Sequence, residues 1–183
     1  MINTQHQTLI VQLQQQITQL QQQLNQLLAQ QQQTSPGVPI RLIIPKIGIN
    51  AVIESLGITP TGEIGVPKGP ATTAWFNLGP RPGDIGNAVI SGHFGYWKTG
   101  VGSVFDNLNK LVKGDNIYVE DEYGKTFVFI VRESKIYDLS ADASSVFNSV
   151  DGNSHLNLVT CEGVWLPAQK TFTNRFVIFS DKE

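Results

Sequence analysis

The sequence has few of the residues that several common classes of protein need. It contains one cysteine, Cys161, among 183 residues, which excludes a disulfide framework within the chain and any zinc site built from cysteines. No apolar run approaches the length of about 18 residues that a membrane-spanning helix requires. Lys and Arg number 13 against 15 Asp and Glu, without a basic stripe, so binding to nucleic acid or to an anionic membrane is not expected.

Charge is also missing from one end of the chain. Residues 1–40 contain no Asp, Glu, Lys or Arg, so every charged side chain lies in residues 41–183. We therefore predict three parts: a glutamine-rich helical stalk over 1–33, a Pro/Gly linker over 34–39 and a globular domain over 40–183. The globular part is long enough to bury an ordinary core without disulfides or metals.

The apolar residues of the stalk repeat with a heptad spacing. They form an a/d seam over nearly three heptads: Ile10, Leu13, Ile17, Leu20, Leu24 and Leu27. Glutamine is a good helix former, so the pattern predicts an amphipathic, coiled-coil-like helix over 9–32. Gln at the e and g positions leaves its partner and orientation open. Residues 9–28 could self-associate, pack on the globular domain and cover its site, or belong to a partly disordered low-complexity segment.

The pattern of the sequence changes after the linker, where two prolines and a glycine end the helix. Short β-branched and aromatic runs follow, separated by Gly, Pro, Asp and Asn: 40–44, 86–91, 117–120, 126–131, 156–160 and 175–179. Residues 121–124 are typical of a hairpin turn. Many short strands of this kind predict an all-β sandwich or barrel. We expect one short helix over 141–150, capped by Asp138 or Ser140.

Two of the few reactive side chains occupy corresponding places. Strand alternation puts His93 on one face with Val89 and Ser91, and it puts Cys161 on one face with Asn157 and Val159. Each comes where its apolar run ends, and loops at strand ends often present catalytic groups. The alternative is that both are structural residues, because a lone cysteine often serves as a small buried hydrophobe.

The remaining candidates are an arginine and the other histidines. Arg175 shares a strand face with Val177 and Phe179, so its charge needs a partner or a groove edge, unless it is a snorkelling surface residue. His6 and His155 complete the three histidines, and no spacing among them is typical of a metal site. We expect no metal and no cofactor.

Five segments resemble, in family order, the signature segments of the sortases. They are 44–49 (IPKIGI), 86–93 (GNAVISGH), 113–117 (KGDNI), 158–161 (LVTC) and 174–178 (NRFVI). The resemblance extends over nearly all of residues 40–180 and is greatest to class F or to the D and E groups. It implies an all-β, eight-stranded sortase-type β-barrel with short helices.

The resemblance also implies an activity and its residues. A sortase is a cysteine transpeptidase that cleaves an LPXTG-like sorting motif between Thr and Gly through a thioester acyl-enzyme. It then transfers the peptide to an amine, such as a cell-wall precursor or a pilin lysine, in surface-protein attachment or pilus assembly. Cys161 would be the nucleophile, His93 the general acid and base, and Arg175 the residue that positions the oxyanion or the substrate. Ser91 and Thr160 would line the substrate groove.

The resemblance further implies an extracytoplasmic protein held on the membrane by an apolar anchor. Since no anchor occurs in this sequence, we expect it to precede Met1, with the stalk as a spacer. Two other interpretations remain. One is a non-catalytic β-barrel adhesion or assembly module on a helical stalk. The other is a different cysteine endopeptidase of chymotrypsin type, although Val159 and Thr160 stand where such enzymes have a glycine-rich turn.

Overall fold

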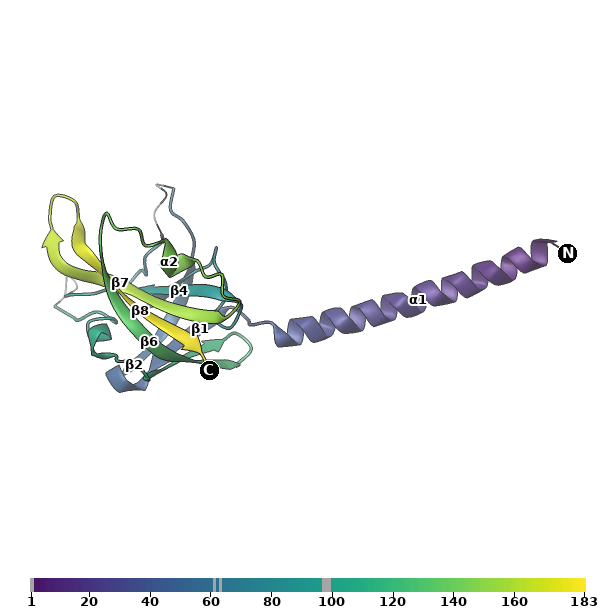
Figure 1. Cartoon of the computed structure of the whole chain (residues 1–183), viewed down its shortest axis with the longest axis horizontal. Coiled ribbons are helices and arrows are strands. Elements are labelled where there is room, and N and C mark those ends of the chain that lie inside the picture. The colour runs from purple at the N-terminus through teal and green to yellow at the C-terminus, as the bar shows by residue number, and fades with distance from the viewer. Residues whose placement is uncertain (1, 61, 63, 97–99) are drawn as a thin grey trace. The chain divides into compact units, whose positions relative to one another are not determined.

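Helix α1 (Ile2–Thr34) forms the glutamine-rich part of the chain in the computed structural model, which describes residues 2–60, 62, 64–96 and 100–183 (Figure 1). The helix extends beyond the predicted 9–32 at both ends, because the chain has no Pro or Gly before Pro36. The six seam side chains of the predicted heptads are 49–64% exposed. The chain divides into two compact units, Met1–Ser35 and Pro36–Glu183.

Eight strands close into a barrel in the described part of the second unit. They are β1 (Pro39–Ile44), β2 (Ile49–Leu56), β3 (Thr73–Phe76), β4 (Gly86–Gly92), β5 (Asn116–Asp121), β6 (Thr126–Asp138), β7 (Ser154–Leu166) and β8 (Thr171–Lys182). Their order around the barrel is β1-β2-β3-β4-β7-β8-β6-β5, and β5 pairs with β1. The β2–β3 and β4–β7 pairs are parallel, and the others are antiparallel. The predicted all-β barrel with an N-terminal helix is confirmed.

Several strands differ from the predicted ranges. Strands β2 and β3 were not among the predicted runs, although the core side chains of β2 alternate along Ile49, Ala51 and Ile53. Strand β7 does not end at Cys161 as we expected. It continues past an irregularity between Glu162 and Trp165, because β8 pairs with it on both sides of that irregularity. Strand β8 likewise begins at Thr171, upstream of the predicted start at Arg175.

The segment that leads into the barrel is bonded to the β5–β6 hairpin. Gly37 N donates to Asp121 Oδ2 over 2.8 Å, and Val38 N donates to Glu122 Oε1 over 2.9 Å. The turn itself is closed by Gly124 N donating to Asp121 O over 2.9 Å, as the predicted hairpin requires. β1 then starts at Pro39, inside the predicted linker.

The helices of the barrel unit are short. The 3₁₀ turns are η1 (Pro45–Ile47) and η2 (Leu108–Lys110), and α2 (Ser144–Phe147) is a single turn within the predicted 141–150. The predicted caps are wrong, because neither Asp138 nor Ser140 is at the helix start. Asp142 Oδ1 accepts from Ser144 N over 2.9 Å instead, in an Asx turn that lies closer to the helix.

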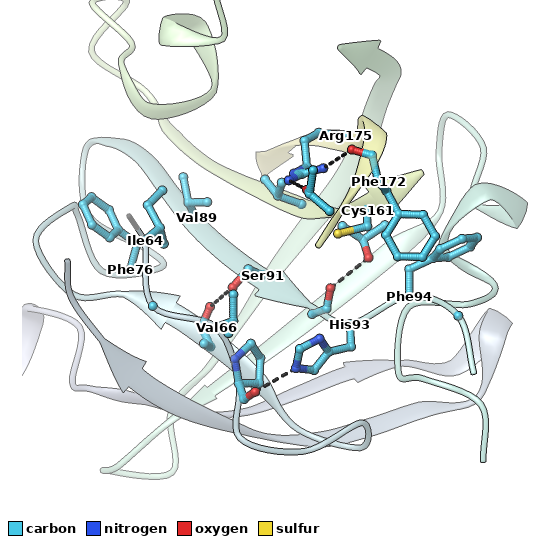
Figure 2. A pocket seen from close by; sticks show the side chains of 18 of the residues that line it. Ile64, Val66, Phe76, Val89, Ser91, His93, Phe94, Cys161, Phe172 and Arg175 are labelled. Carbon is cyan, nitrogen blue, oxygen red and sulfur yellow. Dashed lines mark hydrogen bonds between the residues drawn. The ribbon is translucent and has the colours of Figure 1, made fainter. Parts of the chain in front are cut away.

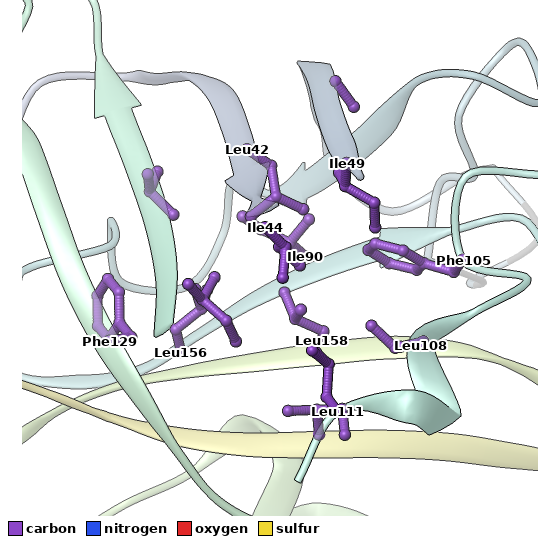
Figure 3. Packing of buried hydrophobic residues seen from close by; sticks show 14 of the residues in the cluster. Leu42, Ile44, Ile49, Ile90, Phe105, Leu108, Leu111, Phe129, Leu156 and Leu158 are labelled. Carbon is purple, nitrogen blue, oxygen red and sulfur yellow. The ribbon is translucent and has the colours of Figure 1, made fainter. Parts of the chain in front are cut away.

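Strands β4, β7 and β8 bury side chains on both of their faces. Their inward face contributes Ala88, Ile90, Leu156, Leu158, Phe176 and Ile178 to the barrel core, where Phe105, Leu108 and Leu111 close one end (Figure 3). Their outward face packs Val89, Val177 and Phe179 against Val146 of α2. The outer surface of these strands is therefore a second apolar layer where it lies against α2.

The end of β4 has no space for a side chain at Gly92. A Cβ there would overlap the ring of Phe105, which is itself fully buried. We expect Gly92→Ala to lower the free energy of unfolding by about 1–3 kcal/mol, since an overpacked core strains its neighbours. Gly69→Ala is the matched control, because a Cβ at Gly69 meets nothing within 4 Å. Urea unfolding of both variants measures the difference, and equal stabilities would contradict the packing described here.

Candidate active site

A groove of about 1020 Å³ lies on the outer face of β4, β7 and β8 (Figure 2). Ile64, Phe76 and Val89 lie toward one end, and His93, Cys161 and Arg175 lie toward the other with Phe94 and Phe172 (Figure 2). Val66, Phe147 and Val159 add further apolar surface to the lining. The three side chains singled out by the sequence thus share one cavity.

The pairing of β7 with β8 places Cys161 opposite Arg175. Their Cα atoms are register partners in the antiparallel ladder, as are those of Val159 and Val177 two residues earlier. Directly opposed residues have Cβ atoms about 4.5–5.5 Å apart and point to the same face of the sheet. Cys161 and Arg175 therefore lie on one face of the sheet.

The parallel pairing of β4 with β7 brings His93 to the same level. Ser91 is the register partner of Val159, and His93 and Cys161 each come two residues later along these strands. Thr160 Oγ1 donates to Gly92 O over 2.8 Å, which joins the end of β4 to β7 immediately before His93. Neighbouring strands lie about 4.8 Å apart, so this register brings His93, directly after the end of β4, level with Cys161 on β7.

The ring of His93 is held by a backbone carbonyl. Its Nε2 lies 2.7 Å from Pro67 O, in the connection between β2 and β3. A carbonyl oxygen only accepts, so Nε2 donates and carries a hydrogen. Figure 2 shows that this nitrogen points away from Cys161.

Arg175 is oriented by its own end of the β7–β8 hairpin. Nη1 donates to Asn174 O over 2.9 Å and to Phe172 O over 3.2 Å, and Nη2 donates to Thr171 Oγ1 over 2.8 Å. These bonds fix a half-buried guanidinium beside the thiol, and within the described residues it forms no ion pair with a carboxylate. Its positive charge therefore acts on the groove.

Two opposing effects act on the Cys161 thiol. Burial raises its pKa above the ordinary value, and the positive charge of Arg175 lowers it to a smaller extent. The net direction is upward, so the neutral thiol predominates at neutral pH in the free protein. Deprotonation of Cys161 in a reaction therefore requires a base.

The two weaker predictions, Ser91 and Thr160, both line the groove but differ in orientation. Ser91 is half-buried, lies on the groove face, and its Oγ donates to Ala74 O over 3.4 Å. Thr160 is 3% exposed, and its hydroxyl is engaged with Gly92 O. A role in substrate binding stays a prediction for both residues.

Of the other two histidines, His155 lies outside this site. His6 is on α1, in the other compact unit. His155 is buried near the start of β7, where Nδ1 is 2.7 Å from Asp181 Oδ1 and Nε2 is 3.1 Å from Asp151. Six residues of strand, about 20 Å, separate His155 from Cys161. In the described residues, no three His, Cys, Asp or Glu side chains gather in a way that could hold a metal ion.

Sequence reasoning missed the groove wall formed by α2. Asn157 Nδ2 donates to Val146 O over 2.7 Å, and Asn87 Nδ2 donates to Ser145 O over 2.9 Å. These bonds hold α2 on the outer face of β4 and β7. Phe147 then meets Phe76 edge to face, with ring centroids 5.9 Å apart. The two buried asparagines within apolar strands were the available signal, because a buried amide needs a partner.

The fold and the groove together define a β-barrel protein with a cysteine, a histidine and an arginine on one strand surface. Residues 42–183 match the family model described as the Sortase domain. This match spans more than half of the chain, and the protein belongs to the sortase family. Among the described residues, no helix is long and apolar enough to cross a membrane.

Solved sortase structures share the fold at low sequence identity. The Clostridium perfringens sortase D5 transpeptidase is 23% identical, with a TM-score of 0.57 over 80% of this chain and 79% of that one. Sortase C-1 from Actinomyces oris is 23% identical, with a TM-score of 0.58 over 79% and 74%. Sortase C2 of pilus island 1 from Group B Streptococcus is 22% identical, with a TM-score of 0.59 over 79% and 73%. No curated protein matches the chain.

The electrostatics of the thiol give a pH prediction. Alkylation of Cys161 by iodoacetamide should rise with pH to a midpoint above the ordinary thiol value of about 8.5. Arg175→Gln should move this midpoint higher, because the charge that favours the thiolate is lost. Arg41→Gln, on β1, is the control and should leave it unchanged. Mass spectrometry measures the alkylation of Cys161 directly, since it is the one cysteine in the sequence. A midpoint below that of a free thiol would contradict the balance described here.

Proposed function

We propose that this protein is a sortase-type cysteine transpeptidase that cleaves an LPXTG-like sorting motif between Thr and Gly and transfers the acyl part to an amine. One observation carries the proposal. Through the pairing of β4, β7 and β8, the side chains of His93, Cys161 and Arg175 line the same end of the groove. Family membership supports it independently.

The first half of the reaction forms a thioester. His93 takes the proton from Cys161 Sγ as the sulfur attacks the Thr carbonyl carbon, because the neutral thiol that predominates in the free protein is a poor nucleophile. The negative charge that develops on the carbonyl oxygen is stabilised by the guanidinium of Arg175. The C–N bond then breaks, and His93 returns the proton to the departing Gly amine.

The second half reverses these proton transfers with a new amine. The incoming amine attacks the thioester carbon and gives a proton to His93 as the bond to sulfur breaks. Cys161 leaves as a thiolate and recovers the proton from His93. The net result exchanges one amide for another, so the reaction needs no cofactor.

The groove has space and chemistry for such a substrate. Its volume is in the range of ordinary ligand sites, and its apolar end suits the Leu and Pro side chains of the motif. The acceptor is an amine of a cell-wall precursor or a pilin lysine, in surface-protein attachment or pilus assembly. The substrate class implies an extracytoplasmic enzyme anchored at the membrane.

Cysteine replacement tests the proposal directly. The parent protein, mixed with a sorting peptide and a small amine, should give cleaved peptide, amine-linked product and an acyl-enzyme mass. Cys161→Ala should give none of these, because the thioester cannot form. Liquid chromatography with mass spectrometry measures all three species.

Histidine variants supply the matched control. His93→Gln should lower kcat/KM by about 100-fold or more, since the proton carrier is removed. His6→Gln, on α1, should leave the rate unchanged. A parent protein that forms no acyl-enzyme with any peptide of a varied sorting-motif library would refute the proposal and favour a non-catalytic module.

A further inference from the structure

The exposed seam of α1 has the residue types of one particular assembly. The a positions hold Ile10, Ile17 and Leu24, and the d positions hold Leu13, Leu20 and Leu27. A β-branched residue at a, as at the first two a positions, with Leu at d favours parallel two-stranded coiled coils. All six side chains are about half exposed along a helix that is continuous through this region.

The flanks of the seam do not oppose pairing between two copies. The e and g positions beside it carry Gln14, Gln16, Gln21 and Gln23, so two copies meet without like-charge repulsion. A helix that lies on a membrane surface typically has Lys or Arg on its polar face, and α1 has none. We propose that two copies of this chain pair through a parallel coiled coil of α1, which brings two barrels to the same end of the helix pair.

Substitutions on and off the seam test the assembly with the full chain. Analytical ultracentrifugation should find a dimer for the parent and a monomer for Ile17→Gln with Leu20→Gln. Val11→Gln is the matched control, because Val11 is equally exposed but lies at a b position outside the seam. Circular dichroism checks that helix remains in each variant.

Engineered cysteines test the orientation. In a Cys161→Ala background, Ile10→Cys should oxidise to a disulfide-linked dimer, because the two a positions face each other only in a parallel pair. An antiparallel pair would instead link Ile10→Cys to Leu27→Cys in a mixture of the two variants. The proposal would be overturned if the parent stayed monomeric at 100-fold the protein concentration of the activity assay. It would also be overturned if the seam variants raised activity without changing the molecular mass found by ultracentrifugation.

A separate observation concerns how His93 is positioned. Glu54, on β2, holds the segment that contains Pro67. Its Oε1 accepts from Thr72 Oγ1 over 2.7 Å and from Lys68 N over 3.1 Å, and Lys68 directly follows Pro67. Pro67 is buried, so its carbonyl oxygen has a defined position against Nε2 of the imidazole.

The bond to Pro67 assigns the two ring nitrogens different tasks. Because Nε2 carries a hydrogen, the lone pair of the neutral ring is on Nδ1. Nδ1 is then the nitrogen that takes the proton from Cys161 and returns it to the leaving amine. If the Pro67 carbonyl moved, Nε2 would lose its acceptor, and the ring could carry its hydrogen on Nδ1 instead.

We infer that Glu54 is a positioning residue for the transpeptidation proposed above: through Lys68 and Thr72 it fixes the Pro67 carbonyl and keeps Nδ1 of His93 as the reacting nitrogen. The Thr72 hydroxyl lowers the pKa of the Glu54 carboxyl, so the accepting carboxylate persists through neutral pH. Only the expected effect of Glu54 on the transpeptidation rate rests on the proposed function; its expected effect on the tautomer of His93 does not.

Paired substitutions separate hydrogen bonding from charge. Glu54→Ala should lower kcat/KM by about 10-fold or more, since small displacements of a catalytic group are costly. Glu54→Gln should restore it to within about twofold, because the amide oxygen accepts the same two bonds. Glu120→Ala, on β5 beside Arg41, is the control for loss of a surface carboxylate.

A measurement on the ring itself does not depend on turnover. In ¹⁵N-histidine-labelled protein above neutral pH, His93 should show its hydrogen on Nε2 in the parent and in Glu54→Gln. Glu54→Ala should populate the hydrogen on Nδ1. Thr72→Val should give a smaller change in the same direction, which covers the case in which Glu54→Ala does not fold.

The outcomes distinguish this inference from the proposed function. An inactive parent with the expected nitrogen spectra would refute the proposed function and leave the positioning by Glu54 intact. An active parent whose Glu54→Ala variant keeps both rate and spectrum would overturn the positioning. Equal damage by Glu54→Gln and Glu54→Ala would also overturn it, because charge rather than the hydrogen bonds would then be required.

Discussion

The register of β7 against its two neighbours is the constraint on which the site depends. Successive side chains of a strand point to opposite faces, so a slip of one residue between β7 and β8 would turn Arg175 into the barrel. The same slip against β4 would turn Cys161 to the face opposite Ser91 and the end of β4 that leads into His93. The buried bond from Thr160 to Gly92 O and the inward packing of Leu156 and Leu158 hold this register.

The sequence was sufficient to predict the elements with a repeating pattern, namely the alternating strands and the heptad helix. Alternation predicted that Cys161 shares a strand face with Val159 and that Arg175 shares one with Val177, and the pairing of β7 with β8 sets these residues opposite one another. It missed β3, which has only four residues, and it ended β7 too early. Composition alone does not show that a strand continues past Gly163, because that continuation depends on pairing with β8.

The parts that sequence reasoning could not supply involve backbone groups and distant contacts. The carbonyl of Pro67 has no signature, since every residue has one, and its use by His93 depends on the path of a loop. The upward net shift in the pKa of Cys161 has a similar origin. Arg175 was predicted to position the oxyanion or the substrate, but the burial that outweighs its charge at the thiol is a property of the assembled groove.

The bonded entry segment determines how a force applied at the N-terminal side of the barrel is distributed. Tension transmitted through residues 1–35 enters the barrel at Pro36 and acts along β1, which is paired on both sides with β2 and β5. The load is then shared by two ladders in shear and by the bonds of Gly37 and Val38 to the β5–β6 hairpin. In the strand order, β2 and β3 separate β1 from β4, and β5 and β6 separate it from β8. Pulling on the chain end therefore strains the side of the barrel away from the thiol.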